Sequence, residues 1–265
     1  MQIHELVTYL HTIAPSHLQE DYDNAGLITG HDGMEIKGVL VCLDAIEAVI
    51  DEAIALGCNV VVAHHPIVFR GLKKLNGSNY IERTIIKAIK NDIAIFAIHT
   101  NLDNVFTHGV NTKIAEKLKL QNTSILQPKP NVTYGDTPVG AGMIGHLESP
   151  MSSDYFLEYL KDRMELSTIK HTSLCKTTIS KVAVCGGSGC FLLNTAKKQG
   201  ADVFISSDFK YHEYFDADNE IIIADIGHFE SEKFTIDLLY DLIINKFSTF
   251  ATHCTKIVTN PIKFF

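Results

Sequence analysis

The stretch Cys58-Asn-Val-Val-Val-Ala-His-His-Pro66 places two adjacent histidines at the end of an apolar run. An apolar run of this length is typical of a β-strand. Successive side chains on a strand point to opposite faces, so two neighbouring histidines rarely chelate one ion together. At a strand end they can diverge toward two ions, and Pro66 favours an extended backbone at His65. Histidine is also the commonest neutral nitrogen ligand of transition metals.

Two further clusters of imidazole and carboxylate follow apolar runs in the same way. They are His99-Thr-Asn-Leu-Asp103 and Gly227-His-Phe-Glu-Ser-Glu232. A single histidine after a strand is usually a hydrogen-bonded structural residue, but an adjacent pair with two such clusters favours metal binding. Three strand ends that offer imidazole and carboxylate together predict one two-metal site. Such mixed ligands suit zinc, iron, manganese and nickel alike, so the sequence does not select the metal.

The spacing of the acidic residues leaves alternatives open. His228 and Glu232 are four residues apart, so a helix that begins near Gly227 would carry both on one face. A solvated helix start would explain Glu232 as well, because acidic residues are favourable there. Asp103 could bridge two ions, or it could make a local turn or cap the next helix. Two ions that share a bridging ligand lower the pKa of bound water toward neutrality.

The composition is that of an ordinary globular protein. The chain has 265 residues, 46% hydrophobic and 20% charged, and 23 basic against 31 acidic residues give a net charge of −8. This balance argues against a nucleic-acid surface. No apolar stretch reaches the ~18 residues of a membrane helix, and the first residues lack a basic signal-peptide region, so we expect a cytoplasmic protein. The six cysteines form no CxxC pair and imply no disulfide framework.

Strand-like runs alternate with helical patterns, which indicates an α/β fold. We expect strands at residues 38–43, 59–63, 93–98, 181–185, 203–206, 220–224 and 252–258, and helices at residues 45–56, 79–90, 110–118, 151–164, 191–199 and 230–245. The region from Gln121 to Pro138 contains three prolines among polar residues. We expect it to be the linker or domain crossing.

An internal similarity suggests two related halves. Val39–Cys42 precedes Gly57–Ala63, and Val182–Cys185 precedes Gly200–Ser206, with the same spacing in both cases. Both units read strand, helix, strand, although chance similarity between two βαβ units would give the same pattern. The fold class that we predict is therefore α/β, with two related α/β domains, the second inserted into the first, around a dinuclear metal site. Residues 1–124 and 226–265 would form the first domain and residues 125–225 the second.

Other polar segments have both functional and structural interpretations. Arg70, Lys73 and Lys74 could hold a phosphate tail beside the metals, whereas a solvated basic turn would need no ligand. The segment Gly186–Gly189 resembles an anion-binding turn but lacks a full nucleotide-binding fingerprint, and a tight turn would also explain it. Asp208 and His212 could orient the metal ligands, form a substrate wall or belong to a capped helix start. No GxSxG motif is present, so we set covalent catalysis aside.

Together the motifs resemble the GTP cyclohydrolase I type 2 homologue family, also called the NIF-three-like proteins. The resemblance extends nearly from end to end and is carried by these segments: Asp21-Tyr-Asp-Asn-Ala-Gly-Leu27, His64-His-Pro66, His99-Thr-Asn-Leu-Asp103, Gly186-Gly-Ser-Gly189, Ser207-Asp208 with Lys210 and His212, and Gly227-His-Phe-Glu-Ser-Glu232. The chain departs from the family pattern at Tyr22, where Trp is usual, and at Ser206-Ser207-Asp208, where Thr-Gly-Asp is usual. These departures concern a pocket wall and a turn.

The resemblance implies a specific site and activity. It implies two α/β domains around two metal ions, held by His64, His65, Asp103, His228 and Glu232, and a homohexamer built as a trimer of dimers. It also implies opening of the purine ring of GTP, with His99 or His212 as proton carriers. The alternative is a metal-binding regulatory or protein-interaction protein without turnover, because a fold does not fix a reaction.

Overall fold

A computed structural model describes all residues, 1–265, and the chain divides by its contacts into two units. Unit 1 comprises Met1–Leu102 and Thr235–Lys263, and unit 2 comprises Asp103–Phe234 with Phe264 and Phe265. In sequence, unit 2 is therefore inserted into unit 1. It begins earlier and ends later than the range 125–225 that we expected, because α5 (Val110–Lys117) and α8 (His228–Glu232) both pack on β8 (Thr178–Ser188) of the second sheet.

Unit 1 is built on a five-stranded sheet in the order β1-β4-β3-β2-β11. The strands are β1 (Gly26–Thr29), β2 (Gly38–Asp44), β3 (Val60–His65), β4 (Ala94–Ala97) and β11 (Ala251–Cys254). All neighbours are parallel except β1, which is antiparallel to β4. The three central strands are buried on both faces, which explains why they read as continuous apolar runs. The parallel strands therefore end at one edge of the sheet.

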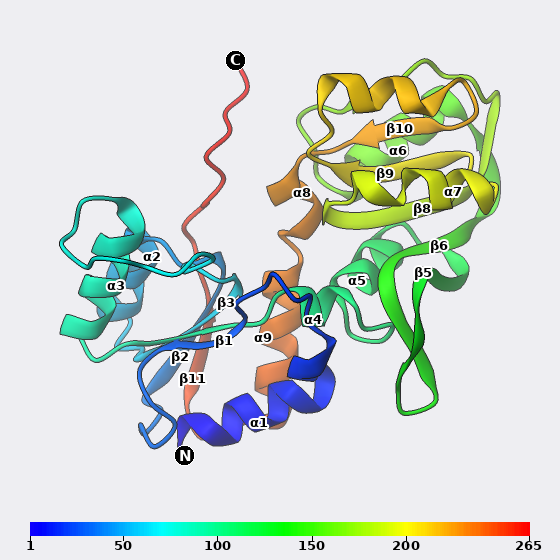
Figure 1. The fold of residues 1–265 in the computed structure, drawn as a ribbon. Coiled ribbons are helices and arrows are strands. Elements are labelled where there is room, and N and C mark those ends of the chain that lie inside the picture. The colour runs from blue at the N-terminus through cyan, green and yellow to red at the C-terminus, as the bar shows by residue number, and fades with distance from the viewer. The chain divides into compact units, whose positions relative to one another are not determined.

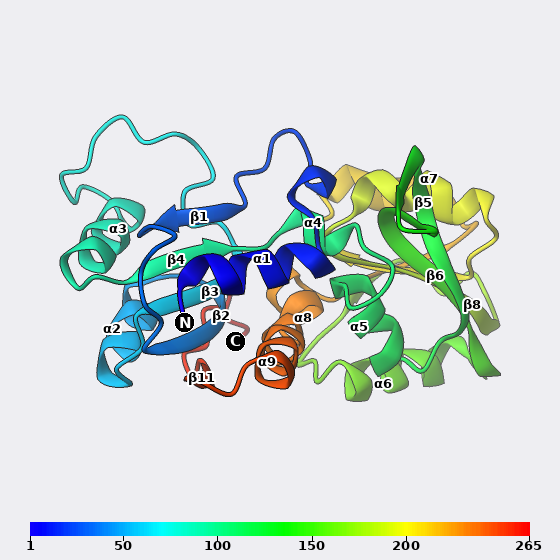
Figure 2. The same ribbon diagram turned by 90° about the horizontal axis from the view of Figure 1, so that it is seen from below.

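Helices cover both faces of this sheet (Figures 1 and 2). On one side lie α2 (Glu47–Ala55) and α3 (Tyr80–Lys90), and a core cluster that includes Leu40, Val61 and Ile95 fills the space beneath them. On the other side α9 (Thr235–Lys246) packs on β2 and β11. The first helix, α1 (Ile3–Ile13), buries Ile3, Leu6 and Leu10 on one face, and its Tyr9 hydroxyl donates to the Leu242 carbonyl. We did not predict α1, β1 or the short helix η1 (Ser16–Leu18).

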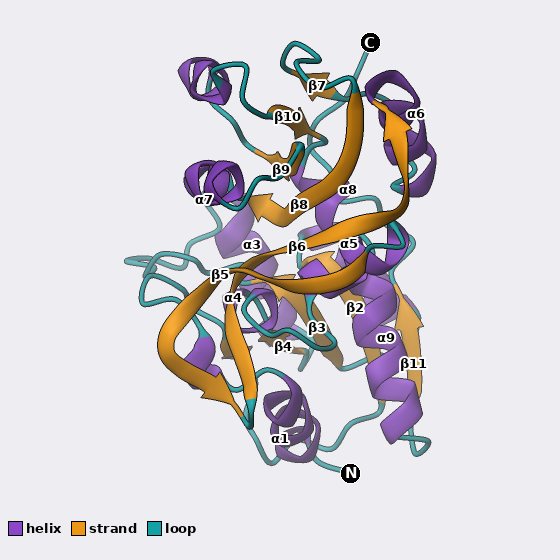
Figure 3. Ribbon diagram, turned by 90° about the vertical axis from the view of Figure 1, so that its right-hand side faces the viewer, coloured by secondary structure: helices purple, strands orange, loops and turns teal.

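Unit 2 is built on a six-stranded sheet in the order β5-β6-β8-β9-β10-β7. Besides β8, its strands are β5 (Gln121–Tyr134), β6 (Thr137–Ser152), β7 (Lys170–His171), β9 (Val203–Ser207) and β10 (Ile222–Asp225). The three strands β8, β9 and β10 are parallel, and the remaining pairings are antiparallel. Figure 3 shows α7 (Leu193–Lys198) on one side of this sheet and α5, α6 (Ser153–Arg163) and α8 on the other. Two short 3₁₀ helices, η2 (Cys190–Leu192) and η3 (Tyr211–Ala217), complete the unit.

The prediction of a linker at Gln121–Pro138 is wrong. This region forms β5 and the start of β6, which are joined in a long hairpin. Prolines fit here because β5 is an edge strand, where a missing N–H breaks no ladder, and the register shifts between Pro128 and Thr133. Gly135, with φ +60°, makes the turn. Proline and glycine marked a sheet edge rather than a domain boundary.

The single helix that we expected at residues 230–245 is also divided. Its first part is α8, which packs on β8 and β9, and its second part is α9, which packs on β2 and β11. The break falls after Glu232, at the border between the two units. Both predicted βαβ units are present, since β2 is parallel to β3 and β8 is parallel to β9. No helix combines the length and apolar character that a membrane span requires.

Candidate metal centre

Unit 1 gathers three histidines at the ends of neighbouring parallel strands. His64 and His65 end β3, and His99 follows β4. One ring nitrogen of each lies within 4.8 Å of a ring nitrogen of the others, and His64 is fully buried. The centroids of adjacent rings are 4.9–5.3 Å apart. We call these three residues the histidine cluster. We expected the adjacent His64 and His65 to diverge toward two ions. In the structure, the pairing of β3 with β4 brings both of them close to His99.

An oxygen acceptor fixes the Nδ1 atom of every imidazole in this cluster. His64 Nδ1 lies 2.9 Å from the carbonyl oxygen of Ile98. His65 Nδ1 lies 2.8 Å from the Asp44 carboxylate, and His99 Nδ1 lies 2.8 Å from the Asp23 carboxylate. Carbonyl and carboxylate oxygens only accept, so Nδ1 carries the hydrogen and Nε2 is the nitrogen that would ligate a metal ion. This arrangement is the one that metal-ligating histidines adopt in proteins.

Asp23 is a site residue whose role the sequence did not reveal. Its segment, residues 21–27, entered our predictions only through the family resemblance, but the Asp23 carboxylate accepts from His99, from the Thr100 amide at 3.1 Å and from the Thr100 hydroxyl at 2.6 Å. Burial would raise the pKa of Asp23, but these hydrogen bonds and the nearby imidazole lower it to about 2. Asp44 was missed as well. Only its position at the end of β2, beside His65 in the sheet register, could have indicated it.

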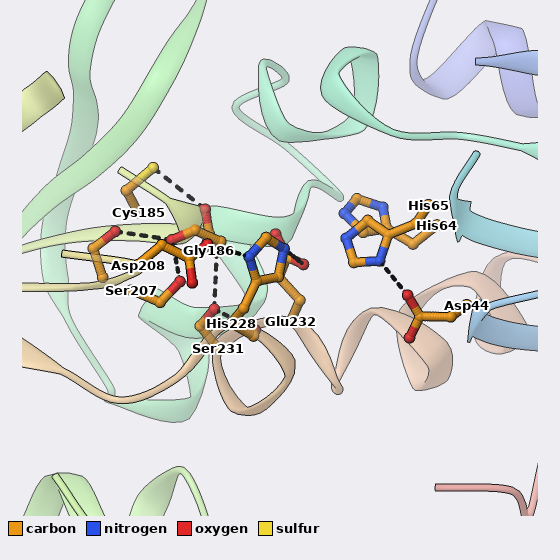
Figure 4. Close-up of polar contacts among 12 residues, drawn as sticks. Asp44, His64, His65, Cys185, Gly186, Ser207, Asp208, His228, Ser231 and Glu232 are labelled. Atoms are coloured by element: carbon orange, nitrogen blue, oxygen red, sulfur yellow. Dashed lines mark hydrogen bonds and ion pairs between the residues drawn. The ribbon is translucent and has the colours of Figure 1, made fainter. Parts of the chain in front are cut away.

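Unit 2 gathers a second set of donors around α8, which we call the mixed cluster: Asp103, His228 and Glu232. His228 and Glu232 lie one turn apart, as their spacing predicted, with Nε2 and Oε2 3.1 Å apart. The ligand atoms of Asp103 and Glu232 lie within 4.8 Å of one another. His228 Nδ1 is 2.6 Å from the Asp208 carboxylate (Figure 4). An oxygen acceptor therefore fixes this imidazole through Nδ1, as in the histidines of unit 1.

Charge pairing sets the protonation of the mixed cluster. Burial would lower the pKa of His228, but hydrogen bonds and charges from Asp208 and Glu232 raise it to about 11. The hydrogen bond from His228 also lowers the pKa of Asp208. Without a metal ion, His228 is therefore an imidazolium between two carboxylates. A metal ion at Nε2 would take the place of that proton.

Two amides of the glycine-rich segment bond side chains of unit 2. The Gly186 amide donates to Asn111 Oδ1 at 3.0 Å, and the Gly187 amide donates to Ser231 Oγ at 2.9 Å. These contacts favour the structural interpretation over an anion-binding turn. Gly187 has φ +63°, and a Cβ atom there would lie 2.4 Å from Glu232 Oε1. Glycine is thus required for the close approach of β8 to the Glu232 carboxylate.

The remaining predicted site residues lie on exposed segments. Arg70, Lys73 and Lys74 lie in the connection between β3 and α3, and all three are exposed. Phe69, in the same connection, has its ring centroid 6.3 Å from that of His99 and 6.3 Å from that of Tyr22. His212 lies in η3, exposed, with its ring 5.2 Å from that of Tyr211. It is not among the residues grouped around His228.

The donors of each cluster fit a transition metal. The histidine cluster has three imidazoles, and the mixed cluster has one imidazole and two carboxylates, of which Glu232 is buried; every imidazole is oriented through Nδ1. Mixed nitrogen and carboxylate donors are typical of zinc, iron, manganese and nickel sites. The fold and these residues thus define a class: an α/β protein of two units, with three histidines in unit 1 and one in unit 2 oriented by oxygen acceptors.

Comparison with known proteins identifies the family. The family model described as Duf34/NIF3 (NGG1p interacting factor 3) matches residues 1–261, and the chain belongs to this family. A relative from Clostridium perfringens, named GTP cyclohydrolase 1 type 2 homolog, is 34% identical over 88% of this chain and 87% of its own length. One of the same name from Staphylococcus epidermidis is 27% identical over 367 residues, with both chains fully covered. The family that the motifs indicated is therefore confirmed.

Solved structures show the same fold. A Staphylococcus aureus protein superposes with a TM-score of 0.91 at 29% identity, covering all of this chain and 99% of its own. A Bacillus cereus protein described as related to NIF3 superposes with a TM-score of 0.90 at 27% identity, with the same coverage. These superpositions confirm the predicted α/β fold class across the whole chain.

Proposed function

We propose that this protein is a dinuclear metal-dependent hydrolase in which His64, His65, Asp103, His228 and Glu232 hold two divalent transition-metal ions. The observation that carries the proposal is the orientation of four imidazoles by oxygen acceptors at Nδ1. Oxygen acceptors in this position raise the basicity of ligating histidines and fix their rings. When bound, a pair of such ions polarises a substrate and lowers the pKa of water.

His99 is the residue best placed to move a proton. Its Nδ1 is held by Asp23, and its Nε2 lone pair belongs to the histidine cluster. The buried Asp23 carboxylate would stabilise the imidazolium that forms when His99 accepts a proton at Nε2. His212 is the weaker candidate, since it is exposed on η3. We assign the general-base role to His99.

The substrate that we propose is a purine nucleotide, with GTP as the first to test. The support is the name of the relatives, GTP cyclohydrolase 1 type 2 homolog, and the chemistry of unit 1. Exposed Arg70, Lys73 and Lys74 follow His64 and His65 in sequence and can pair with phosphates. Phe69 beside His99, and Tyr22 beside Phe69, are 44% and 66% exposed and offer aromatic faces on which a planar ring can stack.

Elemental analysis tests the metal part of the proposal. We expect about two transition-metal ions per chain in the purified protein. His64→Ala, His65→Ala and Glu232→Ala should each lose at least one of them, because each removes a donor atom. His31→Ala and Glu158→Gln, which change exposed residues of unit 1 and unit 2, are the matched controls. Full metal retention by a His65→Ala, Asp103→Ala double variant would contradict the ligand assignment.

Turnover and nucleotide binding test the remaining parts. Metal-loaded protein is incubated with GTP and other nucleotides, and the products are separated by chromatography. Arg70→Ala with Lys73→Ala should weaken nucleotide binding by about 1.5–3 kcal/mol for each hydrogen bond to phosphate that is removed, and should reduce its salt dependence. Lys90→Ala, an exposed lysine at the end of α3, is the control. An unchanged affinity and salt slope would assign the basic residues to the solvated surface.

The second candidate function is metal binding without turnover, in a regulatory or interaction protein. The family description, NGG1p interacting factor 3, favours it for at least one member. The two candidates share the metal centre and differ in chemistry. Absence of product from metal-loaded wild type, with no difference from His64→Ala or Glu232→Ala, would decide for the second candidate.

We also propose that the protein assembles as a homohexamer, a trimer of dimers. The support is the resemblance of the chain to a family of toroidal hexamers. Sedimentation or light scattering would give the mass of the assembly, to be compared with six times the 29.4 kDa chain. A mass that matches one or two chains at micromolar concentration would contradict the proposal.

A further inference from the structure

The last part of unit 1 lies along the strand end that carries Asp44. We call residues 255–263, which follow β11, the C-terminal segment; it continues from β11 toward the C-terminus in Figure 1. Because β11 is parallel to β2, with Cys254 opposite Val41, the chain beyond β11 runs in the direction in which β2 ends. The Thr255 amide donates to the Val41 carbonyl at 2.9 Å. The segment thus reaches the strand ends of the histidine cluster.

Two threonines attach this segment to carboxylates. The Thr255 hydroxyl donates to Glu52 on α2, and the Thr259 hydroxyl donates to Asp44 Oδ2 at 2.5 Å. The two hydrogen bonds are chemically alike, but the two carboxylates differ in their other partners. Asp44 accepts from His65 Nδ1 with its other oxygen, Oδ1, at 2.8 Å, whereas Glu52 bonds only the segment itself, through Thr255 and the Lys256 amide.

We propose that Thr259 is a positioning residue for metal binding: it holds the Asp44 carboxylate in the orientation that fixes the His65 ring. The inference rests on the proposed function in one respect, because it takes His65 as a metal ligand. A carboxylate turns easily about its last bond, since that torsion has broad wells. A hydrogen bond to Oδ2 limits this rotation and keeps Oδ1 directed at His65 Nδ1. The His65 ring is thereby held in place.

The His65–Asp44 pair is partly exposed to solvent, so the hydrogen bond from Thr259 should matter for its geometry. The His65 side chain is 21% exposed and that of Asp44 is 33% exposed, so water can compete for the carboxylate. In contrast, the Asp23 carboxylate that orients His99 is fully buried and accepts from both the amide and the hydroxyl of Thr100. The Asp44 side of the cluster is therefore the one on which an added anchor has the larger effect.

The experiment compares Thr259→Val with Thr255→Val, which removes the equivalent bond to Glu52. Both variants lose one hydroxyl from the same segment, so their melting temperatures should fall by similar amounts. Metal affinity, measured by competition with a chelator for Zn²⁺, should weaken about tenfold in Thr259→Val, the lower end of the range for such outer contacts. It should stay within about twofold of wild type in Thr255→Val and in Thr259→Ser, which keeps the hydroxyl.

A second measurement needs no metal. Nitrogen-15 NMR of the imidazoles in metal-free protein reports which nitrogen carries the hydrogen. In wild type, Thr255→Val and Thr259→Ser, His65 should be the Nδ1–H tautomer, whereas Thr259→Val should show a mixture of tautomers. Equal metal affinity in the two valine variants, or an unchanged His65 tautomer in Thr259→Val, would overturn the inference. Wild type that binds no Zn²⁺ would overturn the proposed function instead, and the NMR comparison would still decide whether Thr259 positions His65.

Discussion

The histidine cluster of unit 1 and the mixed cluster of unit 2 achieve ligand orientation by different means. In unit 1 the donors are imidazoles, and their partners Asp23, Asp44 and the Ile98 carbonyl come from separate loops and strands. In unit 2 the donors are mainly charged and pair with one another, with His228 between Asp208 and Glu232. The imidazoles of unit 1 are thus oriented by partners outside their cluster, whereas His228 is held by the opposite charges of two carboxylates.

This comparison concerns folding as well as ligand binding. Each imidazole of unit 1 pairs through Nδ1 with an oxygen from outside the histidine cluster. The carboxylates of unit 2 would repel one another if His228 were removed, since the charge of Glu232 acts on Asp208. Unit 2 should therefore depend on its cluster for stability more than unit 1 does.

The largest change in stability that we expect comes from Gly187, which lies close to the Glu232 carboxylate. Gly187→Ala should destabilise the protein by about 3 kcal/mol, because it adds a backbone strain of about 1–2 kcal/mol to a clash with the Glu232 carboxylate. Gly200→Ala is the matched control, since Gly200 has φ +72° but open space around its Cβ position. The loss of stability in Gly200→Ala should equal the backbone strain alone, about 1–2 kcal/mol. Denaturant unfolding measures both, and equal losses would show that the approach to Glu232 has no energetic weight.

A smaller effect is expected at the partner of His99. Asp23→Asn should cost about 2 kcal/mol at pH 7, because it removes charge-assisted hydrogen bonds to His99 and Thr100. The pKa of Asp23 is lowered from 3.8 to about 2, so its ionised form contributes stability above pH 4 that is lost as the pH falls through 2. The difference between wild type and variant should therefore shrink between pH 4 and pH 2.

The control for that experiment is Asp21→Asn, two residues earlier and exposed. It should change stability by less than about 0.5 kcal/mol at any pH. Unfolding free energies at several pH values give both curves. A deficit of Asp23→Asn that stays constant down to pH 2 would mean that the Asp23 charge is not what stabilises this loop.

The smallest effect compares one histidine from each cluster in chelator-treated protein. His228→Ala should destabilise the metal-free protein by about 1 kcal/mol more than His65→Ala does, because it leaves Asp208 and Glu232 without the cation between them. The value is small since the His228 side chain is 36% exposed, and solvent screens the charges. Raising the salt concentration should reduce the difference further. A larger loss of stability in His65→Ala would reverse our account of the two clusters.

The sequence alone determined the α/β class, most of the strands and helices, and the donors at the strand ends. These features are local, since apolar runs and the four-residue spacing of His228 and Glu232 are visible in short windows. The sequence did not reveal that the proline-rich region 121–138 is an edge hairpin, because proline is compatible with both a linker and an edge strand. From the sequence we also predicted one helix in place of α8 and α9, since no local signal marks where the helix stops packing on one sheet and begins packing on the other.

Only the tertiary structure decided which residues orient the donors. Asp23 is far from His99 in sequence, and Thr259 is farther still from Asp44, so no window contains both members of either pair. Strand pairing brings them together: β1, which follows Asp23, pairs with β4, which precedes His99, and β11, which precedes Thr259, pairs with β2, which ends at Asp44. A ligand can be recognised by its residue type and by the strand that it ends, whereas its outer partner is an ordinary Asp or Thr that long-range pairing alone makes functional.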